Sequence, residues 1–345
     1  MLTAEQQATG HGFRRATVVG AGLMGRGIAA VLAAGGLDVM VCDVRAEAAR
    51  DAAQFAGEAA ARAGRLGQVT GWAALPDAVS GADLVIEAVV EDIAVKRDVF
   101  AAVSAAAPDA VLATNTSVLP VTEIAAGALR PELVLGTHWW NPPDLIPVVE
   151  VIPGRLTAAD LPGRMMTLLG CLGKTPVLVR RDVPGFIGNR LQHALWREAI
   201  AMVAEGICDA ETLDMVARNT IGLRLARMGP LENADYVGLD LTQAIHKAVL
   251  PSLSADSEPS PLLAALVRRG DLGARTGQGF LPWDPQARAR AARGLAAHLM
   301  AQQPSGASRC GDVPACEREG TERSVAQPGP LTETQPVSTA ERNTA

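Results

Sequence analysis

Residues 16–27 read ATVVGAGLMGRG, and this stretch decides the fold. A strand-like run leads into Gly20, Gly22 and Gly25, which have GxGxxG spacing, and a helical pattern follows. In such a loop the first glycine permits a tight turn and the second lets backbone approach a pyrophosphate. The third lets the helix pack closely on the strand. The stretch therefore predicts a βαβ unit that binds a dinucleotide, and the alternative is that the glycines serve packing alone.

Asp43 ends the next strand-like run, DVMVCD at residues 38–43. An acid about 20 residues after the glycine loop accepts hydrogen bonds from the adenosine ribose and repels a 2′-phosphate. The sequence thus favours NAD over NADP as cofactor. Nearby Arg45 argues for NADP instead, because its charge could accept a 2′-phosphate. A helix cap is the structural alternative for Asp43.

Short apolar runs alternate with helical patterns from Arg15 to about Arg181. Runs rich in Val, Ile and Leu between turn residues are typical of buried strands. They cover residues 16–20, 38–43, 83–89, 110–115, 133–138, 148–152 and 175–179, with helices expected at 45–65 and 93–107. This alternation predicts an α/β fold of the Rossmann type, with a doubly wound, mostly parallel sheet.

The pattern changes after residues 183–185, Val-Pro-Gly. A helix is expected over residues 185–206, Asp209 is a candidate cap for the next one, and residues 234–250 supply another. We therefore predict an NAD-binding Rossmann domain at 14–183 and a smaller all-α domain for substrate and dimerisation at 184–300. Residues 301–345 are rich in Pro, Ser, Thr, Glu and Gly, which predicts a disordered tail.

Composition narrows the class of protein. The 345 residues carry a net charge of −6, which argues against a nucleic-acid partner. The five cysteines are scattered, which fits a reducing compartment better than a disulfide framework or a zinc site. The apolar run after Phe13 imitates a secretory signal, but Arg26 and several glycines interrupt it. We expect a cytoplasmic protein with no metal and no membrane partner.

A candidate reacting centre lies at residues 136–150, GTHWWNPPDLIPVVE. His138 ends a predicted strand, and ligands of open α/β sheets bind beyond the carboxyl ends of strands. A strand–loop–strand return could bring Glu150 beside His138, where a carboxylate would fix the imidazole tautomer and stabilise the imidazolium. The sequence therefore suggests a general base with its acidic partner. A structural histidine beside an aromatic plug is the alternative.

Several motifs together resemble the 3-hydroxyacyl-CoA dehydrogenase family. In chain order they are VVGAGLMGRGIA, VIEAVVEDIAVKRDVF, TNTSVLPVTEIA, GTHWWNPPDLIPVVEVI, PGFIGNRL and GPLENADYVGLD, and the likeness runs from about Arg15 to Trp283. The resemblance implies that His138 is the base and Glu150 its partner. It also implies that Ser117 and Asn189 contact the substrate oxygen. Asn141 matches the asparagine of the family's HxxNP motif and is a further catalytic residue that we expect. A helix cap for Ser117 and an ordinary polar position for Asn189 are the structural alternatives.

The resemblance also implies cofactor contacts and a dimer. Glu91 and Lys96 match residues near the nicotinamide ribose. The cofactor-binding residues that we expect are Gly20, Gly22, Leu23, Met24, Gly25, Asp43, Glu91, Lys96 and Asn115. A homodimer through the helical domain follows from the family likeness.

The substrate is the open question. The first expectation is NAD-dependent oxidation of an L-3-hydroxyacyl-CoA to the 3-ketoacyl-CoA. Relatives that act on small free 3-hydroxy acids, such as gulonate, carnitine or 3-hydroxybutyrate, are the alternative. The tandem tryptophans favour that alternative, because acyl-CoA members often have phenylalanines in their place. Ile146-Pro147 favours it too, because acyl-CoA members commonly carry a lysine shortly before the strand that holds the glutamate. A catalytically idle NAD-binding sensor or structural protein is a more distant hypothesis.

Overall fold

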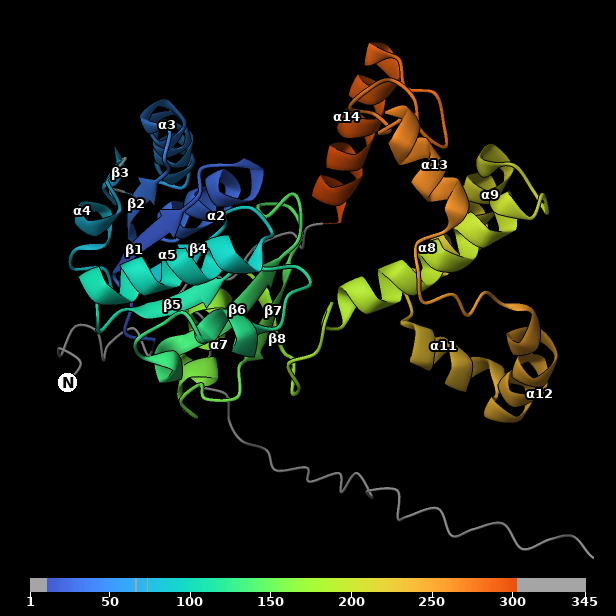
Figure 1. The fold of residues 1–345 in the computed structure, drawn as a ribbon, viewed down its shortest axis with the longest axis horizontal. Helices are drawn as coiled ribbons and strands as arrows, with labels where there is room; N and C mark the ends of the chain where they lie inside the picture. Colours follow the sequence, from blue (N-terminus) through green and yellow to red (C-terminus); the bar gives the residue numbers. More distant parts are fainter. Residues whose placement is uncertain (1–10, 66, 73, 303–345) are drawn as a thin grey trace, which may run out of the picture. The chain divides into compact units, whose positions relative to one another are not determined.

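The computed structural model describes residues 11–65, 67–72 and 74–302, so the tail predicted for residues 301–345 lies almost entirely outside them. Figure 1 shows a single sheet covered by helices, followed by a run of helices. The strands are β1 (Arg15–Val19), β2 (Asp38–Cys42), β3 (Val69–Trp72), β4 (Leu84–Glu87), β5 (Val111–Thr114), β6 (Val134–Trp139), β7 (Val148–Pro153) and β8 (Thr175–Leu178).

The strands form an eight-stranded sheet in the order β3-β2-β1-β4-β5-β6-β7-β8. Neighbours are parallel except β6 and β7, which pair antiparallel. This doubly wound sheet confirms the predicted fold class, and all seven predicted strands are present. β3 was not predicted. It is an edge strand whose residues alternate between half-buried and exposed, and it contains a glycine. Such a segment lacks the continuous apolar run that marks a central strand.

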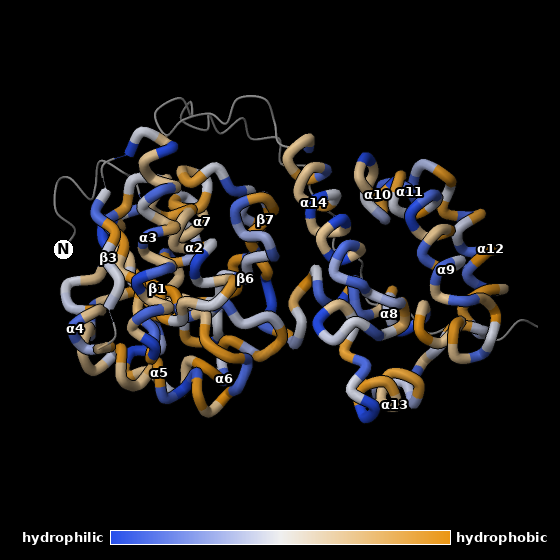
Figure 2. The backbone as a smooth tube through the Cα atoms, turned by 90° about the horizontal axis from the view of Figure 1, so that it is seen from above, coloured by the Kyte–Doolittle hydropathy of each residue, from blue (hydrophilic) through white to orange (hydrophobic). Residues whose placement is uncertain are grey.

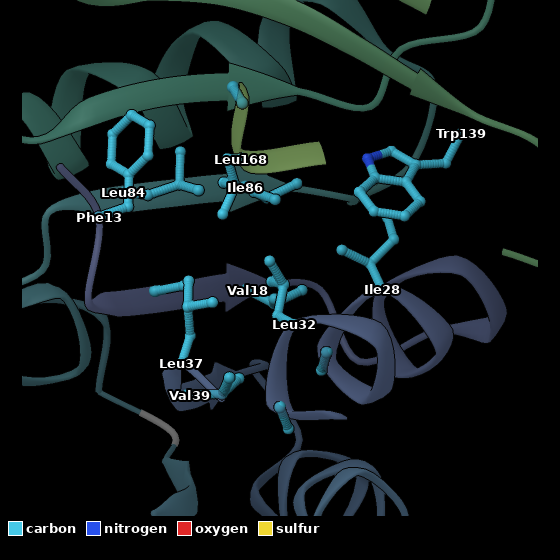
Figure 3. Packing of buried hydrophobic residues seen from close by; sticks show 14 of the residues in the cluster. Phe13, Val18, Ile28, Leu32, Leu37, Val39, Leu84, Ile86, Trp139 and Leu168 are labelled. Atoms are coloured by element: carbon cyan, nitrogen blue, oxygen red, sulfur yellow. The ribbon is translucent and has the colours of Figure 1, made fainter. Parts of the chain in front are cut away.

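Helices cover both faces of the sheet. Those of this part are α2 (Leu23–Ala34), α3 (Ala46–Arg62), α4 (Leu75–Val79), α5 (Ile93–Ala106), α6 (Val121–Ala125) and α7 (Leu161–Cys171). Successive strand residues point to opposite faces, so Val18 belongs to the core under α2, α3 and α7, whereas Val19 belongs to the core under α4, α5 and α6. In Figure 3, Ile28 and Leu32 of α2 pack against Val18, Ile86 and the Trp139 indole.

This topology brings several strand ends together. β1, β4, β5 and β6 are neighbouring parallel strands, so their carboxyl ends meet at the same edge of the sheet. Gly20, Glu87, Thr114 and His138 lie at or next to those ends. Ligands of open α/β sheets bind at this edge.

The second part of the chain is helical, as predicted. Its helices are α8 (Gly188–Ala204), α9 (Ala210–Ala217), a π-helical turn (Arg218–Gly222), α10 (Leu223–Leu225), α11 (Pro230–Val237), α12 (Leu239–Val249), α13 (Pro261–Arg269) and α14 (Pro285–Ala301). Asp209 caps α9, because its carboxylate accepts a hydrogen bond from the Thr212 amide. The single helix expected over residues 234–250 is wrong: Gly238, with φ 108°, divides it into α11 and α12. None of the helices in the described residues is long and apolar enough to cross a lipid bilayer.

Candidate active site

The glycine loop has the geometry of a phosphate cradle. Gly20 has φ +104°, and a Cβ there would lie 2.5 Å from the Ala88 carbonyl oxygen. A Cβ at Gly25 would collide with the Gly20 carbonyl, whereas a Cβ at Gly22 would meet no atom within 4 Å. Gly22 is the N-cap of α2 and offers no side chain to its amides. The open space at this helix N-terminus therefore suits a pyrophosphate.

Asp43 lies beside this loop at the end of β2. Its carboxylate accepts hydrogen bonds from the Ala21 amide at 2.8 Å and from the Arg45 amide at 2.9 Å. It does not cap α3, whose N-cap is Arg45. A carboxylate has about four acceptor sites, so capacity remains for ribose hydroxyls. The Arg45 side chain is 75% exposed, with Nε 3.7 Å from Asp43.

His138 and Glu150 form a buried pair. They are directly opposite each other in the antiparallel β6–β7 ladder, each only 3% exposed. Nδ1 of His138 lies 2.6 Å from Oε2 of Glu150. Because this contact engages Nδ1, it favours the tautomer in which Nε2 is free to accept a proton. The strand–loop–strand return suggested by the sequence thus exists.

Glu150 also connects β7 to the second part of the chain. Its Oε1 accepts hydrogen bonds from the amides of Ile187 at 2.9 Å and Gly188 at 3.1 Å, where α8 begins. Burial alone would raise the pKa of Glu150, but the hydrogen bonds from His138 and these two amides hold it below its ordinary value. Glu150 therefore remains a carboxylate beside the imidazole at neutral pH.

Two aromatic rings confine the imidazole of His138. The ring centroids of His138 and Trp140 are 4.9 Å apart, and those of His138 and Phe186 are 5.7 Å apart. Phe186 is 1% exposed and has φ 50°, an unusual backbone conformation for a bulky residue. Trp140 also packs on the backbone of Gly188, where a Cβ would collide with its indole. The tryptophan thus fits beside the histidine only because residue 188 has no side chain.

Glu91 organises the segment that carries Ser117. Its Oε1 accepts hydrogen bonds from the Ser117 amide at 2.9 Å, the Val118 amide at 3.1 Å and the Thr116 hydroxyl. Burial opposes ionisation of Glu91, but the Thr116 hydroxyl, the charge of Lys96 and the two amides lower its pKa. The carboxylate consequently fixes the main chain at Ser117, a half-buried residue at the strand-end edge.

Lys96 lies in a buried network rather than at the surface. Its ammonium is 2.7 Å from Oε1 of Glu87 and 3.3 Å from Oε2 of Glu91. Glu87 and Lys96 are each at most 1% exposed, and Glu87 also accepts a hydrogen bond from the Thr114 hydroxyl at 2.8 Å. Two acids and one lysine therefore tie the ends of β4 and β5 to α5.

The three asparagines that the sequence predicts for the site have different environments. Asn189 of α8 is 7% exposed and donates from Nδ2 to the Ser117 carbonyl at 2.9 Å, which joins the helical part to the Ser117 segment. Asn115 accepts a hydrogen bond from the Trp139 amide at 3.0 Å, so it connects β5 to β6. Asn141 is exposed in the loop after β6, and its described contacts include no hydrogen bond to His138 or Glu150.

Comparison with known proteins decides the family. The model of the 3-hydroxyacyl-CoA dehydrogenase NAD-binding domain matches residues 15–183, and that of the C-terminal domain of the same enzymes matches residues 185–283. The chain belongs to the 3-hydroxyacyl-CoA dehydrogenase family. It is an NAD-dependent oxidoreductase of that family, which confirms the resemblance seen in the sequence.

Its relatives in this family differ in substrate. The chain is 37% identical to a 5-formyl-3-hydroxy-2-methylpyridine 4-carboxylate 5-dehydrogenase of Mesorhizobium japonicum over 79% of its length and 92% of the relative's. It is 38% identical to a probable 3-hydroxybutyryl-CoA dehydrogenase of Bacillus subtilis, over 77% and 96% of the two chains. A crystal structure of a 5-formyl-3-hydroxy-2-methylpyridine 4-carboxylic acid 5-dehydrogenase, described as an NAD⁺-dependent dismutase, superimposes with a TM-score of 0.79 at 34% identity. That match covers 84% of this chain and 97% of the other.

Three residues around the site of this protein were not predicted from its sequence. Glu87 binds Lys96, Phe186 packs against His138, and Lys174 donates hydrogen bonds to the loop after His138. Glu87 had a visible signal, since it is an acid at the end of the buried run DLVIEAV. Phe186 had none, because an unusual φ angle leaves no mark in a sequence.

Proposed function

We propose that this protein oxidises a substrate hydroxyl to a carbonyl, with His138 as the general base. The observation that carries the proposal is the buried contact between His138 Nδ1 and Glu150, which leaves Nε2 to accept the hydroxyl proton. The ionised Glu150 would stabilise the imidazolium that results. Bound NAD supplies the hydride acceptor.

The proposed cofactor site uses the strand-end edge of the sheet. Gly20, Gly22 and Gly25, with Leu23 and Met24, would hold the pyrophosphate at the N-terminus of α2, and Asp43 would accept the ribose hydroxyls. Glu91 lies in the loop after β4, Lys96 in α5 and Asn115 directly after β5, and we propose that they face the nicotinamide end of the cofactor. Because Lys96 and Asn115 are already engaged with protein groups, we propose that Lys96 acts mainly by holding Glu91.

We propose that Ser117, Asn189 and Asn141 surround the substrate oxygen. Ser117 and Asn189 are joined by a hydrogen bond of 2.9 Å, which supports a shared role. That bond uses one of the two donors of the Asn189 amide, so the second is available to a substrate. Asn141 follows Trp140 in the chain, and its exposure leaves it accessible.

The first candidate substrate is an L-3-hydroxyacyl-CoA, which would yield the 3-ketoacyl-CoA. The relatives that support it are 3-hydroxybutyryl-CoA dehydrogenases, several of them 36–38% identical to this chain. The second candidate is a small free 3-hydroxy acid such as gulonate, carnitine or 3-hydroxybutyrate. It is favoured by the Trp140 indole beside His138, and by the relative that acts on a pyridine carboxylate.

Formation of NADH from a panel of substrates distinguishes these candidates. The panel contains four compounds with a hydroxyl to oxidise, which are 3-hydroxybutyryl-CoA, free 3-hydroxybutyrate, carnitine and gulonate. It also contains 5-formyl-3-hydroxy-2-methylpyridine-4-carboxylate, whose aldehyde would have to lose its hydride as the hydrate. Turnover of the thioester alone supports the first candidate, and turnover of free acids alone supports the second. No turnover of any substrate by protein that binds NAD would contradict the proposal and favour a sensor or structural role.

A further inference from the structure

Lys174 lies in the turn between α7 and β8, and its side chain reaches the loop that follows His138. Its ammonium donates to the carbonyl oxygens of Pro143, Ile146 at 3.1 Å and Asp144 at 3.5 Å. Nζ also lies 5.8 Å from the centre of the Trp139 ring, within the range of a cation–π contact. One side chain thus contacts three carbonyl groups of the loop between β6 and β7.

The partners of Lys174 are main-chain carbonyls rather than an acid. No salt bridge of the described residues involves it, and the acid that acts on its charge is Asp144 in the same loop. The charged groups of the neighbouring elements have other partners: Glu150 of β7 is bound to His138, Arg164 of α7 is near Asp160, and Arg26 of α2 lies over Phe55. β8 contributes no charged side chain. An ammonium group whose partners are main-chain carbonyls is suited to fix the backbone of the loop between β6 and β7.

The loop connects the candidate base to the cofactor helix. It begins beside Trp140, whose indole contacts His138, and its Pro143 packs on α2, where a Cβ at Gly27 would lie 2.5 Å from the proline ring. The main chain is anchored too, since the Thr175 amide donates to the Pro147 carbonyl at 2.9 Å. A shift of this loop would therefore move Trp140 and Asn141.

We propose that Lys174 is a positioning residue, whose ammonium fixes the loop of residues 141–147 and thereby holds Trp140 and Asn141 beside His138. The inference rests on the proposed function for its effect on turnover, but not for its effect on the loop.

The charge of Lys174 makes this positioning sensitive to pH. Burial lowers the pKa of Lys174 to about 8, against an opposing effect of Asp144. A neutral amine has one N–H fewer than the ammonium, so one of the loop carbonyls loses its donor. Turnover should consequently fall above pH 8. The free energy of unfolding should not fall in this range. A lysine whose pKa drops from 10.5 to about 8 on folding lowers the free energy of unfolding below pH 8. This destabilisation disappears as the pH rises from about 8 to 10.5.

Lys174→Met tests the inference, with Lys247→Met on α12 as control. The chain has three lysines, and Lys247 is exposed and distant in sequence from the loop. Lys174→Met should lower kcat roughly 10- to 100-fold, as misplacement of a reacting group does, with little change in NAD affinity. The Leu145 and Ile146 amides, which bond to the Pro142 carbonyl, should exchange hydrogen about tenfold faster. Lys247→Met should change neither.

Two further measurements keep the proposal testable if Lys174→Met folds poorly. In wild-type protein labelled at lysine Cε, one NMR signal should titrate near pH 8, with the same midpoint as the alkaline fall in kcat. Lys174→Arg, charged at all accessible pH values, should restore most of the turnover and abolish that fall. Unchanged exchange in Lys174→Met, or an alkaline fall that persists in Lys174→Arg, would overturn the proposal. If exchange responds but the wild type oxidises no substrate, the proposed function fails while the loop contact stands.

Discussion

At the scale of the residue, the neighbours of His138 set the orientation of its imidazole ring. Glu150 fixes one ring nitrogen, and Trp140 and Phe186 confine the ring. The Glu150 partner could be anticipated, because a strand–loop–strand return permits the two residues to lie opposite each other, and the register of β6 and β7 pairs them. Phe186 and Lys174 could not, since their contacts depend on the φ angle of one residue and on the packing of a distant turn.

Substitution of the proposed base is the most direct test at this scale. His138→Gln should lower turnover by roughly 10²- to 10⁴-fold, the usual contribution of a positioned acid–base group. Glu150→Gln should also lower turnover, because it removes the charge that stabilises the imidazolium. If the two act as a unit, the double variant should be little worse than His138→Gln alone. Steady-state kinetics with a turned-over substrate measures all three variants.

The exposed His246 of α12 provides the matched control, and His246→Gln should leave turnover unchanged. Affinity for NAD should hardly change in His138→Gln, because the glycine loop is unaltered. Wild-type turnover in folded His138→Gln would show that the histidine is structural.

We expect the preference for NAD over NADP to depend on one carboxylate, that of Asp43. Asp43 keeps acceptor capacity beside the glycine loop and would repel a 2′-phosphate, so NAD should bind more tightly than NADP. Asp43→Ala should narrow the difference, since both the ribose acceptor and the repulsion disappear. Titration of NADH and NADPH fluorescence measures both affinities. Equal affinities in the wild type would refute this role of Asp43.

At the scale of the element, seven of the eight strands were predictable, including the edge strand β8, whereas the edge strand β3 was not. Buried parallel strands are apolar on both faces, so β1, β4 and β5 stand out in the sequence. β3 is as short and as exposed as β8, but Thr70 and Gly71 interrupt its apolar run, so its sequence resembles a loop. The break between α11 and α12 depends on the positive φ of Gly238, which a helical apolar pattern conceals.

The start of α8 offers a prediction about packing between elements. Gly188→Ala introduces a methyl group where the Trp140 indole lies, so the indole must move away from His138. Such a displacement should lower kcat roughly tenfold or more. A smaller ring should relieve the clash, so the double variant Gly188→Ala, Trp140→Phe should recover much of the loss. Kinetics of both variants checks this expectation.

Gly163→Ala is the control for this substitution. Gly163 lies in α7, and a Cβ there would meet no atom within 4 Å. The change should be neutral or stabilising by up to about 1 kcal/mol, because alanine favours a helix. If Gly188→Ala is as harmless as Gly163→Ala, the Trp140 packing has no effect on turnover.

At the scale of the whole molecule, the helical part exposes large apolar side chains. Leu241, Ile245 and Val249 recur every fourth residue along α12, and each is 43–49% exposed. Residues at this spacing share one helix face. Leu231 and Tyr236 of α11 are 80% and 81% exposed, and orange segments mark apolar residues along these helices in Figure 2. Single chains rarely expose such a concentration, which is typical of an interaction surface.

We propose that the face of α12 formed by Leu241, Ile245 and Val249 contacts a second copy of the chain within the helical domain at residues 184–300. The double variant Leu241→Glu, Ile245→Glu would bury charges in that interface without partners, so it should dissociate the dimer to 35.8 kDa chains. Light scattering during gel filtration measures the mass. The control is Leu129→Glu, which changes a residue 70% exposed on the Rossmann part and should leave the dimer intact. A wild-type mass of one chain would contradict the proposal, because a homodimer must double it.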